Sequence, residues 1–169
     1  MKSKWSAILG MAVLTAALAG QSAFGQGGAG AKQKGQYNFW EAQGWQHHAQ
    51  NQARSLYNYS QTPQPTADQA QEHATAARKG VTSAQKSLAE LKKSNPDNKE
   101  AQAAIAKIEE IQKKVLSHCE MCDKAIAKDD HTGMAACCAD IFHDLEAANA
   151  EMKKLQKALK ISDPELPKK

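Results

Sequence analysis

Four cysteines fall within one stretch of 20 residues, and the chain has no others: Cys119, Cys122, Cys137 and Cys138. Thiolates are ligands that soft ions such as Cu(I) prefer, and Zn(II) accepts them together with histidine. Two cysteines can instead be oxidised to a disulfide. The cysteines therefore point to soft-metal binding, to a disulfide-stapled structure, or to thiol catalysis.

Two predicted helices carry these cysteines. From residue 105 to 126, apolar residues recur at alternating steps of three and four, which marks one face of a helix, and Cys119 and Cys122 lie on that face. Cys138 lies on the equivalent face of a last helix, predicted from about Met134 to Ile161. Cys137 projects about 100° to the side. Three thiols are therefore expected inside a helical core and the fourth at its edge.

Residues 129–133 (DDHTG) predict a tight turn between these helices. Positions equally far from the turn lie at one level of such a hairpin, so Cys122 is expected to face Cys138. His118 and His143 flank this layer, and the preceding turn near Pro96 places His73 opposite Cys119. The candidate metal ligands are the four cysteines and three histidines, Cys119, Cys122, Cys137, Cys138, His118, His143 and His73.

A disulfide is the main alternative, because exported proteins usually have oxidised cysteines. Within a helix, Cβ atoms at i and i+3 lie about 5–6 Å apart. A disulfide needs about 3.5–4.5 Å, so a Cys119–Cys122 bridge would strain the helix. A bridge across the hairpin, from Cys122 to Cys138 or Cys137, is more plausible. The protein would then be a stapled structural or interaction module of the cell envelope without metal.

An enzyme is not expected. A catalytic Cys-x-x-Cys pair favours a helix N-terminus, where the helix dipole stabilises the thiolate. Cys119 and Cys122 lie near the predicted C-terminus of their helix, beside Glu120 and Asp123. Covalent haem attachment would need a histidine at position 123.

The remaining elements are also helical. A strong helical rhythm runs from Ala70 to Leu91, after a possible cap at Thr66, and ends at the break of residues 95–97. Residues 37–60 have a weaker helical pattern, interrupted by Gly44, and residues 61–65 form a proline-containing linker. No segment shows β alternation. The predicted fold class is all-α, an antiparallel helical bundle over residues 37–163 with a C-terminal tail at 164–169.

The N-terminus has the organisation of an export signal. Lys2 and Lys4 precede an apolar run at residues 7–19, and Ala23 and Gly25 fit a cleavage pattern. The run is shorter than the roughly 20 residues that span a bilayer. Residues 1–25 are therefore expected to be a removed signal peptide, which predicts a bacterial periplasmic or secreted protein. Residues 26–36, rich in Gly, Gln and Lys, are expected to be flexible.

The charge balance excludes one class of partner. The chain has 22 Lys and Arg against 18 Asp and Glu, with only two arginines, Arg54 and Arg78. The basic residues are spread along the helices, so nucleic-acid binding is not expected. No segment after the signal is long and apolar enough to cross a membrane.

The segment 118–145 (HCEMCDKAIAKDDHTGMAACCADIFHDL) resembles the cysteine-rich four-helix-bundle copper-storage proteins. The likeness is carried by Cys119, Cys122, the Asp130-His131 turn and Cys137-Cys138-Ala139. In that family, helix–turn–helix segments carry inward cysteines around an acidic, histidine-containing turn. Those proteins line much of the bundle with thiols, whereas this chain has four, so the resemblance implies one or a few ions.

Taken together, these features predict an exported soft-metal-binding protein that acts as a chaperone, sensor or small buffer. Copper as Cu(I) is the first choice of ion and zinc the second. The disulfide-stapled module without metal is the alternative.

Overall fold

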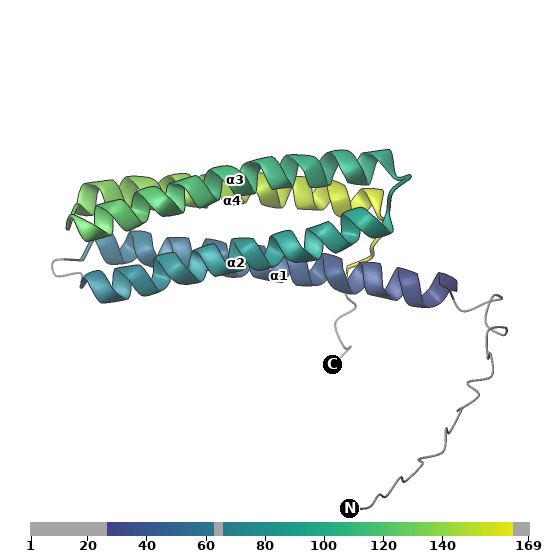
Figure 1. Cartoon of the computed structure of the whole chain (residues 1–169), viewed down its shortest axis with the longest axis horizontal. Helices are drawn as coiled ribbons and strands as arrows, with labels where there is room; N and C mark the ends of the chain where they lie inside the picture. Colours follow the sequence, from purple (N-terminus) through teal and green to yellow (C-terminus); the bar gives the residue numbers. More distant parts are fainter. Residues whose placement is uncertain (1–26, 63–65, 164–169) are drawn as a thin grey trace, which may run out of the picture.

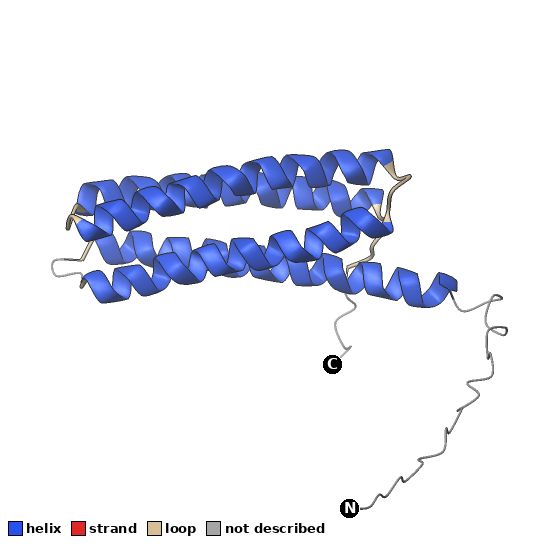
Figure 2. Ribbon diagram, in the orientation of Figure 1, coloured by secondary structure: helices blue, strands red, loops and turns tan. Residues whose placement is uncertain are grey.

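The computed structural model describes residues 27–62 and 66–163, and this part of the chain contains four helices and no strand (Figures 1 and 2). The helices are α1 (Gly27–Ser60), α2 (Ala67–Ser94), α3 (Lys99–Ala127) and α4 (His131–Ala158). The prediction of an all-helical bundle is confirmed. The expected signal peptide at residues 1–25 and the tail at residues 164–169 lie outside the described residues.

The four helices pack in a closed ring. α1 contacts α2 and α4, and α3 contacts the same two helices. Figure 1 shows the chain reversing direction at each short connection, so that α3 and α4 lie side by side along their length. None of the described helices is sufficiently long and apolar to cross a membrane.

The turn between α3 and α4 is shorter than predicted. The Asp130 side chain accepts a hydrogen bond from the Gly133 N–H at 2.9 Å and so caps the helix. Asp129, with φ of 55°, is the residue that reverses the chain. As a result α4 begins at His131, and Thr132 and Gly133, expected in the turn, are helical. α4 also ends at Ala158, before the predicted Ile161, with Lys160 in the left-handed region at φ 53°.

α1 is longer than the sequence suggested. It begins at Gly27, so residues 27–36, expected to be flexible, belong to a helix. A helix that is already nucleated extends at small cost, about 1 kcal/mol even for each glycine. The weak pattern of residues 37–60 does mark a buried face, since Phe39, Ala42, Ala49 and Leu56 are at most 1% exposed.

A layer of buried amides divides the core into two apolar clusters. One cluster surrounds the cysteines, and the other is aliphatic and aromatic, with Phe39, Leu88, Ile105 and Leu155 among its members. Between them, Gln112 donates to Gln46 at 3.2 Å and Gln46 donates to Asn149 at 2.8 Å. Asn149 in turn donates to Gln50 at 3.0 Å. Gln46 and Gln112 are fully buried, whereas Asn149 and Gln50 are only partly buried, so this chain of amides joins α1, α3 and α4 from the interior outward.

Candidate metal centre

All four cysteines are free thiols, and all are buried. Cys119, Cys122 and Cys138 are 0% exposed, and Cys137 is 5% exposed. The helical rhythm predicted this burial for three of them. Cys137 is also covered, although it was expected at the edge. The bundle therefore gathers the four softest nucleophiles of the chain inside one apolar cluster.

Cys122 lies at the centre of the thiol group. Its Sγ is 3.8 Å from the Sγ of Cys138 on the facing helix, which confirms the predicted pairing across the hairpin. This distance exceeds the roughly 2.05 Å of a disulfide. Two sulfurs bound to one tetrahedral ion, each at about 2.3 Å, lie about 3.8 Å apart. The separation therefore suits two ligands of a single ion without movement of the backbone.

The surroundings of the thiols favour their neutral form. Burial, followed by the neighbouring thiol of Cys122, raises the pKa of both Cys119 and Cys137 to about 12. The pKa of Cys122 is also raised, first by its hydrogen bond with Cys138 and then by burial. These three thiols are protonated at neutral pH, so a bound metal ion would have to displace their protons.

A cation lies beside the thiols on the α2 side. Arg78 of α2 donates a hydrogen bond to Asp123 of α3 in an ion pair, and Gln71 donates to the same carboxylate at 3.1 Å. The positive charge of Arg78 acts on Cys119 and partly offsets the rise of its pKa. Sequence reasoning missed Arg78. Arg78 lies off the apolar rhythm of α2, and its partner Asp123 is supplied by α3, so the pattern of a single helix gives no signal for it.

The three candidate histidines have other partners. His73 of α2 shares a hydrogen bond with Gln52 of α1 at 2.8 Å. His118 lies toward two carboxylates of α4, with its Nε2 3.4 Å from Asp144 and its Nδ1 3.8 Å from Asp140. The structure thus brings the four cysteines together but does not gather these two histidines with them.

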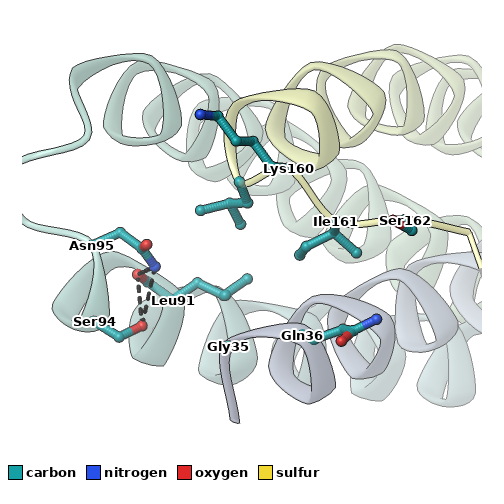
Figure 3. Close-up of a pocket in the computed structure, with 9 residues that line it drawn as sticks. Gly35, Gln36, Leu91, Ser94, Asn95, Lys160, Ile161 and Ser162 are labelled. Atoms are coloured by element: carbon teal, nitrogen blue, oxygen red, sulfur yellow. Dashed lines mark hydrogen bonds between the residues drawn. The ribbon is translucent and has the colours of Figure 1, made fainter. Parts of the chain in front are cut away.

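His143 occupies a different position. Its exposed side chain lies 3.4 Å from Glu146, and it lines a surface cavity of about 370 Å³. Cys138 lines the same cavity, so His143 and one of the cysteines share this surface feature. A second cavity, of about 400 Å³, is formed where the C-terminal ends of α2 and α4 meet α1, and its lining includes Leu91 and Ile161 (Figure 3). No cysteine lines it.

The four thiols are suitable ligands for a soft ion, but their side chains are packed against one another and do not form a preassembled metal site. Within residues 27–62 and 66–163, no three His, Cys, Asp or Glu side chains are already gathered to hold a metal ion. Cys122 and Cys138 have a suitable separation, and Cys119 and Cys137 are close enough to Cys122 for its charge to raise their pKa.

Comparison with family models, with curated proteins and with solved structures gives no match to this chain.

Proposed function

We propose that this protein is an exported Cu(I)-binding protein, an antiparallel four-helix bundle whose cysteines hold one or a few ions. The observation that carries the proposal is the pair of facing thiols, Cys122 and Cys138, with sulfurs 3.8 Å apart inside a cluster that contains two more cysteines. Four buried thiols in one cluster supply the ligands that Cu(I) prefers. With so few thiols, the capacity fits a chaperone, sensor or small buffer.

Copper is favoured over zinc by the charge that must be buried. Cu(I) with two thiolates leaves a single negative charge, and the guanidinium of Arg78, itself ion-paired with Asp123, has a favourable effect on the nearby thiolate of Cys119. Because two-coordinate Cu(I) is nearly linear, the sulfurs of Cys122 and Cys138 would have to move apart from 3.8 Å by side-chain rotation. Zn(II) with four thiolates leaves two negative charges in the same apolar surroundings. A neutral zinc site would need two histidines, and His73 and His118 have other partners. Zinc therefore remains the second choice.

The first test is a Cu(I) titration of the mature, reduced protein without oxygen, against a chromophoric Cu(I) chelator. We expect the protein to withdraw at least one Cu(I), with the stoichiometry read by native mass spectrometry. The Cys122→Ser/Cys138→Ser variant should lose more than about 100-fold in affinity, because even the loss of outer partners of a ligand costs 10–100-fold. Unchanged affinity of this variant would refute the proposed ligands.

A matched control separates loss of ligand from damage to the core. Ala104 is a buried residue of α3 in the other apolar cluster, so Ala104→Ser also buries a hydroxyl but far from the thiols. This control should keep its full Cu(I) affinity. The variants His73→Ala, His118→Ala and His143→Ala, measured in the same way, decide whether any histidine joins the cysteines as a ligand.

The alternative function has its own signature. Protein isolated without reduction, denatured and treated with a thiol-alkylating reagent should take up four alkyl groups if the cysteines are free for metal. A mass two or four hydrogens light, with no metal and correspondingly fewer alkyl groups, would instead support the disulfide-stapled module.

A further inference from the structure

The cavity that includes Cys138 lies between α1 and α4 and has the size of a small-molecule site. Its volume is about 370 Å³, within the range of roughly 300–1,000 Å³ of typical ligand pockets. α1 contributes Arg54, Tyr57 and Asn58, and α4 contributes Cys138, Phe142 and His143. The cavity therefore connects a solvent-exposed polar surface with one residue of the buried thiol cluster.

The charge of the cavity favours an anion. The guanidinium of Arg54 lies over the ring of Phe142, 5.0 Å from its centroid, which fixes the cation at the cavity. No residue of the lining is acidic, and among the described residues no carboxylate is ion-paired with Arg54. Tyr57 and Asn58 add a hydroxyl and an amide that can donate hydrogen bonds. A small ligand with carboxylate groups fits these donors.

The wall of the cavity leads to the thiols. Cys138 is part of the lining, yet it is fully covered from solvent, and its sulfur lies 3.8 Å from that of Cys122. Phe142, one helical turn further along α4, is only partly buried. Exposed side chains change rotamer within picoseconds to nanoseconds, so the partly buried and exposed residues of this lining can move while a ligand is bound.

We propose that this cavity is the entry point for Cu(I) carried by a small anionic thiol, an inference that rests on the proposed Cu(I) binding. Arg54 binds the carboxylate of the carrier, and the thiol of Cys138 replaces one carrier thiolate. One carrier sulfur–copper bond breaks and a Cys138 sulfur–copper bond forms. The Cys138 proton leaves with the released carrier thiol, so charge and oxidation state are unchanged. Cys122 then completes the transfer in the same way.

The transfer rate tests this step. Cu(I) is supplied to the reduced protein either in excess glutathione, which is an anionic thiol, or in excess 2-mercaptoethanol, which is uncharged. Arg54→Gln should slow uptake from glutathione about tenfold, since charges at the rim of a site act mainly on association, and should leave uptake from 2-mercaptoethanol unchanged. Equal slowing from both carriers, or none from either, would overturn the inference. Arg54→Lys should retain most of the rate.

A charge-matched control is available at the same end of the bundle. Lys124 is an exposed residue of α3 that does not line the cavity, so Lys124→Gln removes the same charge elsewhere. It should leave both uptake rates unchanged. A rate loss equal to that of Arg54→Gln would mean that overall charge, rather than the cavity, attracts the carrier.

A second measurement needs no metal and separates the two proposals. S-methylglutathione keeps the carboxylates but has no free thiol, so it should bind the cavity of the metal-free protein. We expect it to shift the amide NMR signals of Arg54, Asn58 and Phe142, and not to do so in Arg54→Gln. If the wild type takes up no Cu(I) from either carrier, the proposed function and the transfer step fail together. Absence of shifts at millimolar ligand, with Cu(I) uptake intact, refutes the cavity alone.

Discussion

The sulfur of Cys122 on α3 lies 3.8 Å from the sulfur of Cys138 on α4, at facing positions of a hairpin that Asp130 caps. Cys119 and Cys122 lie one turn apart on a single helix, where a disulfide would strain the backbone. Oxidation of the metal-free protein should therefore join the two helices rather than two positions of one helix.

We expect diamide to produce a Cys122–Cys138 disulfide first. Closing a loop of this length should raise the free energy of unfolding by about 3 kcal/mol. Peptide mapping under non-reducing conditions identifies the pair, and urea unfolding gives the stability. Cu(I) binding should be lost in the oxidised protein and restored by reduction. Cys119–Cys122 as the first product would contradict the geometry of the hairpin.

The thiols should make stability depend on pH in the alkaline range. In the folded state the pKa of Cys119 and that of Cys137 are raised to about 12, against 9.0 for an unperturbed thiol. Between these values the unfolded chain loses protons that the folded protein retains, so the free energy of unfolding falls as pH rises. Each thiol contributes a decrease of up to about 1.4 kcal/mol per pH unit, and little below the unperturbed pKa.

This prediction is measured by urea unfolding of the reduced, metal-free protein between pH 8 and pH 11. Lysine and tyrosine residues titrate equally in all variants. The slope of unfolding free energy against pH in Cys119→Ser, compared with the slope in wild type, therefore reports the contribution of one thiol. The slope of the variant should be shallower above pH 9, and the two should coincide below it.

Two glycines of the bundle should respond oppositely to the same substitution. A Cβ on Gly80 of α2 would lie 2.9 Å from the backbone oxygen of Trp45 and 2.9 Å from the Cβ of Ala49, so α1 and α2 approach closely there. Gly80→Ala should cost about 1–3 kcal/mol. A Cβ on Gly44 of α1 would meet nothing within 4 Å. Gly44→Ala should stabilise by about 0.5–1 kcal/mol, and thermal unfolding of the pair checks both signs.

The buried amides predict an order of stability. Gln46→Met would leave the buried Gln112 amide without a partner, at about 1–3 kcal/mol, and would also remove the donor to the partly buried Asn149 oxygen. Gln112→Met leaves one such group, the Gln46 oxygen, and removes the Gln112 oxygen, which has no hydrogen-bond partner. The Gln46 variant should therefore be less stable than the Gln112 variant in urea. The reverse order would mean that the amide chain is not intact in solution.

The sequence allowed the helices and the level of the thiols to be predicted, but not the partners of the polar side chains. Cys122 and Cys138 follow the apolar rhythm, so hairpin counting placed them face to face. His73 and Arg78 lie off that rhythm on α2. The orientation of each side chain is set by its hydrogen-bond partner on a neighbouring helix, Gln52 of α1 for His73 and Asp123 of α3 for Arg78. Such partners come from packing between helices, which periodicity along one helix does not specify. The sequence around Asp130 predicted a turn, but it did not show that Asp130 caps α4 and that the helix begins at His131.

The amide layer also has a consequence for the position of each helix along its neighbours. An apolar seam alone tolerates a slide by one heptad, because one aliphatic side chain fits nearly as well as another. Such a slide would bring Gln112 against aliphatic side chains and separate it from Gln46, leaving polar atoms buried without partners. The hydrogen bonds between the amides therefore fix the axial register of these helices. Because the amides fix the position of α3 along α1 and α4 near the middle of the bundle, they also keep Cys122 and Cys138 facing each other further along the hairpin.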